Sequence, residues 1–216
     1  MSFTIVIPAQ ETNKYHKLGD LAPFGDTTLL EWKISQCKEF VKPSQIYISS
    51  DSEMVEEIVK KEEVNFIKRK TGLSYQDMLV ETIDKIIDST DIIWINTTSP
   101  FMNANVYKAM YKKYQTEDLS SLVSVEKKKE YILFNNHKLN FSDDFISRKD
   151  IEPIYIMTNG CYIIKKDTAL NSKNLLSSNP KLFEVDSFVA SEIKDVQDYT
   201  VAKEMISIYF RKEFDV

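Results

Sequence analysis

Short apolar runs rich in Ile, Val and Tyr alternate with segments of helical spacing, and this alternation constrains the fold more than any other feature of the chain. The expected strands are residues 3–7, 45–49, 64–67, 92–95 and 121–125, and the expected helices are residues 28–40, 52–61, 75–87 and 103–114. The expected N-caps are Ser52, Ser74 and Asn103. Strands that alternate with such helices form right-handed crossovers in a parallel sheet. The sequence therefore predicts a three-layer α/β fold with a mostly parallel sheet and residues 3–7 as a central strand.

The pattern changes near residue 126. Residues 127–150 are polar and irregular with short apolar pieces, and they are predicted to leave the sheet as a hairpin, a lid or a dimer arm. The chain is then expected to return with strands at residues 154–157 and 161–164 and to form a final helix over residues 196–211. We therefore interpret residues 1–216 as a single domain with one excursion.

Charge and cysteine content argue against several classes of function. A net charge of −5 and an isoelectric point near 5.2 disfavour a nucleic-acid binder, because such proteins present a basic surface. Cys37 and Cys161 lack metal-ligand spacing, which is typical of a reduced, cytoplasmic protein. No signal peptide is expected from the first residues, and no apolar run is long enough for membrane insertion.

The loop after the first strand is the most informative about ligands, since parallel α/β sheets bind ligands at the carboxyl ends of their strands. Residues 10–20 bring Lys14 and Lys17 to that edge. Lysine ammonium groups can neutralise the negative charge that builds up on a leaving pyrophosphate, so a triphosphate site is one interpretation. Solvated loop lysines are the alternative, and these residues alone do not separate the two.

The ends of the next strands offer further polar candidates. Asp51 could contact ribose or a metal ion, or cap the following helix. The cationic run 68–70 faces the same edge and suits phosphate, although such runs are often solvated. Ser74 is a candidate base or ribose contact as well as a helix cap, and Asn96 could hydrogen-bond a ribose or a sugar.

An ordered set of motifs over nearly the whole chain resembles the CMP-sialic acid synthetase (acylneuraminate cytidylyltransferase) family. The matching residues are Pro8-Ala9 with Lys14, Leu29-Leu30-Glu31-Trp32, Ser49-Ser50-Asp51-Ser52-Glu53, Thr98-Ser99-Pro100, Leu122-Val123-Ser124-Val125, Arg148 and Asp150 with Pro153, Tyr155, Asn159 and Gly160, and Glu192-Ile193 with Asp198-Tyr199 and Ala202. Each motif alone is weak, and the resemblance rests on their common order.

The resemblance implies a Rossmann-like nucleotidyltransferase fold and an activity that uses CTP to convert an acidic, sialic-acid-like keto-sugar to a CMP-sugar and pyrophosphate. It also implies a Mg²⁺ cofactor, a homodimer formed through residues 127–150, and a role in cell-surface polysaccharide biosynthesis. The implied nucleotide-binding residues are Pro8, Ala9, Gln10, Asn13, Lys14, Arg69, Ser74, Asn96, Thr98 and Ser99. The implied catalytic residues are Lys14 and Lys17, the substrate-binding residues are Arg148, Tyr155 and Asn159, and the metal ligands are Glu192 and Asp51. In this scheme Arg148 pairs with the sugar carboxylate.

Several positions depart from the family pattern. Gln10 replaces an Arg, Gly19-Asp20 replaces Lys-Asn, Met102 replaces a second Arg, and Lys194 replaces a metal-binding Asp. A charged lysine cannot ligate Mg²⁺. Either Glu192 holds a hydrated ion with help from Glu184 or Asp186, or Lys194 itself replaces the cation. Two alternatives therefore stay open: a nucleotidyltransferase with a phosphate or phosphonate acceptor, and a non-catalytic relative that binds nucleotide.

Overall fold

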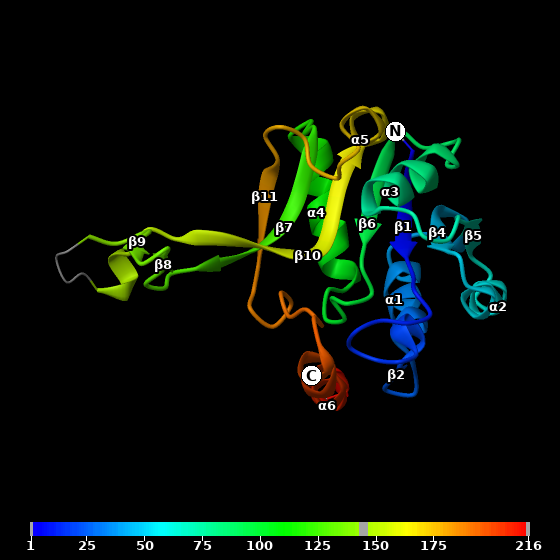
Figure 1. Cartoon of the computed structure of the whole chain (residues 1–216), viewed down its shortest axis with the longest axis horizontal. Coiled ribbons are helices and arrows are strands. Elements are labelled where there is room, and N and C mark those ends of the chain that lie inside the picture. The colour runs from blue at the N-terminus through cyan, green and yellow to red at the C-terminus, as the bar shows by residue number, and fades with distance from the viewer. Residues whose placement is uncertain (1, 143–146, 215–216) are drawn as a thin grey trace.

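The computed structural model describes residues 2–142 and 147–214, with side chains up to residue 206. In this part of the chain the main sheet has seven strands in the order β11-β7-β10-β6-β1-β4-β5 (Figure 1). The strands are β1 (Phe3–Pro8), β4 (Ile46–Ser50), β5 (Asn65–Lys68), β6 (Asp91–Ile95), β7 (Ser121–Lys128), β10 (Ile154–Lys165) and β11 (Lys181–Val185). Only β10 runs antiparallel to its neighbours among these strands. The predicted mostly parallel sheet is confirmed, with β1 in its interior.

Helices cover both faces of the sheet. The first group is α1 (Leu29–Lys38), α2 (Glu53–Lys61) and α4 (Ala104–Thr116), and the second is α3 (Tyr75–Asp84) and α5 (Lys166–Ser172). Successive residues of a strand point to opposite faces. Ile5 and Ile7 therefore pack with the first group, whereas Val6 packs with the second. The predicted three layers are confirmed.

Side-chain caps fix where the helices begin. Ser52, Ser74 and Asn103 accept hydrogen bonds from the backbone amides of Val55, Asp77 and Asn105, respectively, as predicted. A capping box joins Thr28 and Glu31 at the start of α1. α2, α3 and α4 are the next helices along the chain after β4, β5 and β6, so their caps also mark where the loops at the carboxyl edge of the sheet end.

Strand β10 corrects the prediction of two separate strands at residues 154–157 and 161–164. It runs unbroken from Ile154 to Lys165, with a register shift between Met157 and Tyr162. Asn159 has a left-handed φ of 54° within this irregularity. At the next position, a Cβ added to Gly160 would lie 2.2 Å from the sulfur of Met102. The Asn-Gly pair therefore bends the strand where Met102 packs beneath it.

Edge strand β11 and helix α5 were not expected from the sequence. β11 pairs in parallel with β7 and leaves Lys181 and Leu182 exposed. Its sequence, Lys-Leu-Phe-Glu-Val, is short and half polar, so its strand conformation depends on pairing with a neighbour. α5 has only seven residues and begins directly where β10 ends.

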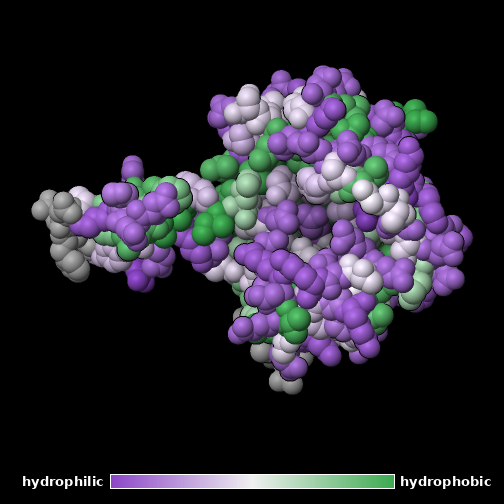
Figure 2. Space-filling view, viewed as in Figure 1, coloured by the Kyte–Doolittle hydropathy of each residue, from purple (hydrophilic) through white to green (hydrophobic). Residues whose placement is uncertain are grey.

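The arm, which we define as residues 126–142 and 147–157, projects from one side of the body (Figure 1). At its base β7 and β10 pair beyond the sheet, and further out lie the two short strands β8 (Leu133–Phe134) and β9 (His137–Lys138). Large apolar side chains are exposed along the arm, and Figure 2 shows apolar surface there. These side chains are Tyr131, Leu133, Phe134, Leu139, Tyr155, Ile156 and Met157. Whether the arm is a lid or a dimer interface stays a prediction.

Helix α6 (Val196–Phe214) lies beyond the carboxyl edge of the sheet (Figure 1). Its residues Tyr199 and Ala202 pack with Tyr15 and Phe24 in a third apolar cluster. The hydroxyl of Tyr199 also donates a hydrogen bond of 2.5 Å to the carbonyl of Pro23. The helix therefore braces the first loop. Among the residues that the structure describes, no helix is both long and apolar enough to cross a membrane.

Candidate nucleotide site

A polar cavity of about 580 Å³ lies at the carboxyl ends of β1, β4 and β5. Its walls are Gln10, Glu11, Thr12, Asp51, Ser52, Arg69, Lys70, Thr71, Gly72, Leu73, Tyr75 and Met78. Figure 2 shows a hydrophilic hollow in the middle of the body. The cavity has the size and position of a small-molecule site in an α/β protein.

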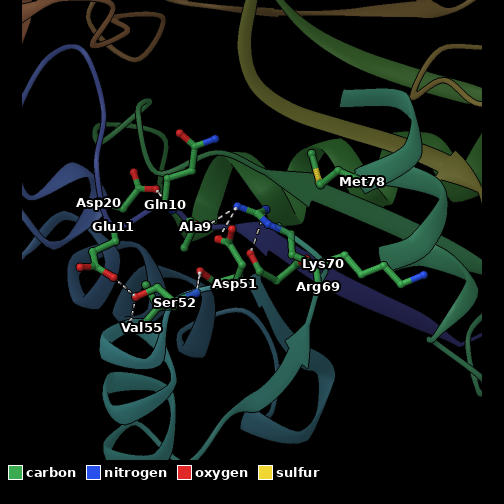
Figure 3. Close-up of polar contacts among 12 residues, drawn as sticks. Ala9, Gln10, Glu11, Asp20, Asp51, Ser52, Val55, Arg69, Lys70 and Met78 are labelled. Carbon is green, nitrogen blue, oxygen red and sulfur yellow. Dashed lines mark hydrogen bonds and ion pairs between the residues drawn. The ribbon is translucent and has the colours of Figure 1, made fainter. Parts of the chain in front are cut away.

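Arg69 fastens the cavity floor. Its guanidinium donates hydrogen bonds to the carbonyl oxygens of Ala9 (3.0 Å) and Ser49 (3.2 Å), so it joins the ends of β1 and β4 (Figure 3). It also lies 3.7 Å from the carboxylate of Asp51, and burial lowers the pKa of Arg69. Arg69, a predicted nucleotide contact, thus lines the cavity and also holds the ends of β1 and β4 together.

The charges on the cavity wall balance. Arg69 and Lys70 contribute two cations, and Glu11 and Asp51 contribute two carboxylates. Glu11 is held in place by the hydroxyl of Ser52, 2.6 Å away. In Figure 3 the ammonium group of Lys70 points away from the guanidinium of Arg69. A triphosphate bound here would therefore need further positive charge from beyond the cavity wall.

The buried carboxylate of Asp20 anchors the first loop, a role that sequence reasoning missed. It accepts hydrogen bonds from the backbone amide of Gln10 (2.6 Å), from the hydroxyl of Tyr15 (2.6 Å) and from the hydroxyl of Thr97. Burial raises the pKa of Asp20 above its usual range, although these hydrogen bonds favour the charged form. Gly19 has a φ of 48°, and a Cβ there would lie 2.3 Å from the Gln10 carbonyl. The Gly-Asp pair was visible in the sequence only as a departure from the family pattern.

The predicted catalytic lysines lie on the first loop outside the cavity wall. Lys14 and Lys17 are both exposed, and neither belongs to the cavity lining. Asn13 accepts a hydrogen bond from the Lys14 amide, 2.7 Å away, and its side chain lies 3.4 Å from that of Gln10. The catalytic role of the two lysines stays a prediction.

Other predicted nucleotide contacts have structural partners in the protein. Pro8 ends β1, Ser74 caps α3, and the Thr98 carbonyl accepts a hydrogen bond of 2.7 Å from the amide of Ile193. Ser99 is fully buried, so the structure does not offer its side chain to a ligand. The Ser99 carbonyl instead accepts a hydrogen bond of 2.8 Å from the buried Lys33 ammonium.

A second polar network lies around the bend in β10. The amide nitrogen of Asn96 donates to the backbone and side-chain oxygens of Asn159, at 2.6 and 3.1 Å. Asn159 in turn donates to the carboxylate of Glu192 at 3.0 Å, and the ammonium of Lys194 lies 3.7 Å from the other oxygen of that carboxylate. The hydroxyl of Tyr162 donates to the Asn159 side chain at 2.9 Å. Of the predicted substrate-binding residues, this network contains Asn159.

The other two predicted substrate-binding residues are on the arm. Arg148 is exposed and pairs with Glu130, 3.1 Å away. Tyr155 is exposed on β10, with the ammonium of Lys127 5.9 Å from its ring centre. Within one chain, the structure therefore does not bring Arg148 into the Asn159 network.

The predicted metal ligands belong to different networks. Asp51 faces Arg69 in the cavity, whereas Glu192 faces Lys194 and Asn159. Across the described side chains, no group of three or more His, Cys, Asp or Glu residues is placed to hold a metal ion. Each carboxylate also has a basic neighbour, which disfavours a divalent cation beside it. Mg²⁺ is often held by one or two carboxylates together with phosphates of the substrate, so the Mg²⁺ cofactor stays a prediction.

A mostly parallel α/β sheet with a polar cavity at its carboxyl edge defines a class of proteins that bind small molecules at that edge. A family model described as cytidylyltransferase matches residues 17–211, and the chain belongs to this cytidylyltransferase family. The match begins after Lys14, so it does not test the first motif, which contains Pro8 and Ala9.

Similar proteins agree with this family. The N-acylneuraminate cytidylyltransferase of Streptococcus agalactiae serotype V is 23% identical over 167 residues, which cover 71% of this chain and 40% of the relative. The solved CMP:2-keto-3-deoxy-manno-octonic acid synthetase complexed with CTP has a TM-score of 0.75 at 14% identity, covering 97% of this chain and 100% of that one. The 4-diphosphocytidyl-2C-methyl-D-erythritol synthase of Anaerococcus prevotii has a TM-score of 0.71 at 12% identity, covering 95% and 98%. The two structures show the shared fold, and the match spans well under half of the curated relative's length.

Proposed function

We propose that the chain is a CTP-dependent nucleotidyltransferase that attaches CMP to an acidic keto-sugar and releases pyrophosphate. The observation that carries this proposal is the cavity at the ends of β1, β4 and β5, with Arg69 and Lys70 in its wall. Membership of the cytidylyltransferase family supports CTP as the donor. The names of the S. agalactiae relative and of the octonic acid synthetase, both for acidic keto-sugars, support the acceptor class.

In the proposed reaction, an acceptor hydroxyl oxygen attacks the α-phosphorus of CTP. The bond from that phosphorus to the oxygen bridging it to the β-phosphate breaks, and pyrophosphate leaves with the electron pair while the hydroxyl loses its proton. Such transfers depend mainly on positioning and on charge stabilisation. The amides of Glu11 and Thr12 and the cations Arg69 and Lys70 would bind the phosphates, with Lys14 and Lys17 closing over them from the exposed loop.

The acceptor would bind beside the second polar network. Asn96, Asn159 and Tyr162 supply the hydrogen-bonding groups there, which suit the hydroxyls of a sugar. In this proposal Mg²⁺ binds chiefly through the phosphates of CTP, because the described side chains include no group of three or more metal-ligating residues.

A phosphorylated or phosphonate acceptor is the second candidate. The observation that favours it is the exposed Lys70 ammonium, which points away from Arg69 and is available to a second anionic group (Figure 3). The likeness to the erythritol synthase shows that this fold also occurs in a protein named for an acceptor other than an acidic sugar.

We further propose a cytoplasmic homodimer formed through the arm, acting in cell-surface polysaccharide biosynthesis. Support for the dimer comes from the exposed apolar side chains of the arm, of which Leu133 and Phe134 are 66% and 64% exposed. Exposed apolar side chains clustered on one projection are typical of a protein interface. Light scattering during size exclusion should give about twice the chain mass of 25.1 kDa. A monomer at every concentration tested would contradict this part of the proposal.

The test of function measures pyrophosphate release from each of the four nucleoside triphosphates with a panel of keto-sugar acids and a panel of sugar phosphates. We expect release from CTP with a keto-sugar acid. Release only with phosphorylated acceptors would favour the second candidate. CTP binding without release under any condition would identify a non-catalytic relative, and no CTP binding would refute the proposal.

A further inference from the structure

Glu192 is a well-oriented carboxylate outside the cavity wall. Its side chain is 15% exposed, and each of its oxygens faces a donor: Asn159 on one side and Lys194 on the other. The Lys194 side chain is 65% exposed. In this pair the Glu192 carboxylate is mostly buried and held in one orientation, whereas the Lys194 ammonium faces solvent.

The orientation of Glu192 is set by the Asn159 amide, which cannot flip without losing hydrogen bonds. The Asn159 side-chain oxygen accepts from Asn96 and from the hydroxyl of Tyr162. Its nitrogen must then face Glu192, because an amide group has one accepting and one donating end. Asn159 has a left-handed φ of 54°, a conformation that Asn adopts readily.

Hydrogen bonds and one step along the backbone connect this pair to the nucleotide cavity. Gln10 of the cavity wall donates to Asp20, and Asp20 also accepts from Thr97. The next residue back, Asn96, donates to Asn159, which holds Glu192. Gln10 and Asp20 follow β1, Asn96 and Thr97 follow β6, and Asn159 lies at the β10 bend, whereas Glu192 comes from the segment between β11 and α6. The sheet order changes direction between β1 and β6. Ligands of open α/β sheets bind at such switch points.

The cavity wall carries no net charge, so a bound triphosphate would need a further cation to neutralise it. Two cations and two carboxylates line the cavity, whereas a triphosphate carries several negative charges. Glu126 lies near Lys194 as well, but its own carboxylate is paired with Lys128. Lys194 thus keeps an exposed ammonium at the end of the connection that starts in the cavity.

We propose that Lys194, held by Glu192, is a fixed cation that binds anionic phosphate oxygens of the nucleotide or of the pyrophosphate. The inference rests on the proposed function and extends it, since it adds a further cation to Arg69 and Lys70 of the cavity wall and to the lysines of the first loop. It also accounts for the poor fit of Glu192 to Mg²⁺, because an ammonium beside the carboxylate repels a second cation.

Isothermal titration calorimetry with CTP and, separately, with inorganic pyrophosphate tests this proposal. Each ligand is titrated in EDTA and in Mg²⁺, into the wild type, Lys194→Met and the control Lys203→Met, which removes an exposed lysine from α6. We expect Lys194→Met to weaken both ligands about two- to fivefold in EDTA, within the range of a partly exposed ion pair. The control should leave both affinities unchanged. In the CTP complex, Lys194→Asp should bind Mg²⁺ more tightly than the wild type.

The outcomes separate the inference from the proposed function. Equal affinities of the wild type and Lys194→Met for both ligands in EDTA would overturn the role of Lys194 while leaving CTP binding intact. Loss of CTP binding by the wild type, with pyrophosphate still bound in a Lys194-dependent way, would support the cation site and refute the proposed function. Binding of neither ligand by the wild type would overturn both. Thermal unfolding of each variant shows whether it is folded, and Lys194→Gln provides a second neutral variant.

Discussion

Removing the Asp20 carboxylate should destabilise the protein, because three buried donors converge on it. The hydroxyls of Tyr15 and Thr97 donate to one oxygen, and the amide of Gln10 donates to the other. Tyr15 and Thr97 are each only 2% exposed, so water does not readily replace the lost acceptor. An unsatisfied buried donor costs about 1–3 kcal/mol. The charged carboxylate is itself disfavoured by burial, which offsets part of this cost.

We therefore expect Asp20→Ala to lower the free energy of unfolding by about 3–5 kcal/mol, from two or three unsatisfied donors. Asp20→Asn keeps the oxygen that serves Tyr15 and Thr97 but turns an amino group toward the Gln10 amide. It should cost about 1–3 kcal/mol, the value for one lost acceptor. Asp26→Ala, at an exposed position in the neighbouring turn, is the matched control and should change stability by less than about 0.5 kcal/mol.

Urea unfolding followed by circular dichroism measures these differences at neutral pH. Because Asp20 also holds Gln10 in the cavity wall, both Asp20 variants should bind CTP more weakly than the Asp26 control. If Asp20→Ala unfolds at the same urea concentration as Asp26→Ala and binds CTP equally well, the assignment of Asp20 as the anchor of the first loop is wrong.

Three further predictions concern the core, the β10 bend and the arm. Burial lowers the pKa of Lys33 to about 7. Between pH 7 and the ordinary lysine pKa, the folded state therefore binds fewer protons than the unfolded state. The free energy of unfolding should rise across that window by up to about 1.4 kcal/mol per pH unit. Lys33→Met should lack this rise in parallel urea titrations, and an identical pH profile would contradict the assignment. Gly160→Ala should cost about 1–3 kcal/mol by overpacking against Met102, and a Met102→Ala background should reduce that cost in a double-mutant cycle. A cost unchanged by Met102→Ala would show that the contact is not its cause. If the arm forms the dimer, Phe134→Lys should raise the dimer dissociation constant, measured by sedimentation equilibrium, at least tenfold. The control is Lys138→Arg, an exposed position on the arm where the substitution keeps the charge and leaves the apolar surface unchanged.

The layers of the fold could be predicted because the sequence pattern is local and strong. Residues such as Ile5, Val6 and Ile7 alternate between two apolar clusters, and Ser52, Ser74 and Asn103 mark helix starts by their own chemistry. β11 was missed because its strand conformation depends on pairing with β7, which no local pattern reveals. The continuity of β10 was missed because Asn159 and Gly160 are typical turn residues, and here they bend a strand instead.

The candidate site was predicted only in part, since its contacts join distant segments. Arg69 was expected at the edge of the sheet, but its bond to the Ala9 carbonyl crosses 60 positions of sequence. Asp20 carried no motif, and its role follows from burial beside Thr97, 77 positions away. Arg148 was assigned to the sugar from the motif order alone, whereas the structure pairs it with Glu130 on the arm.

The most direct test of the central claim is a crystal structure of the protein with CTP. The account predicts density for CTP in the cavity, with its triphosphate between the backbone of Glu11 and Thr12 and the side chains of Arg69 and Lys70. A cavity that stays empty at saturating CTP, or a nucleotide bound away from the ends of β1, β4 and β5, would contradict it.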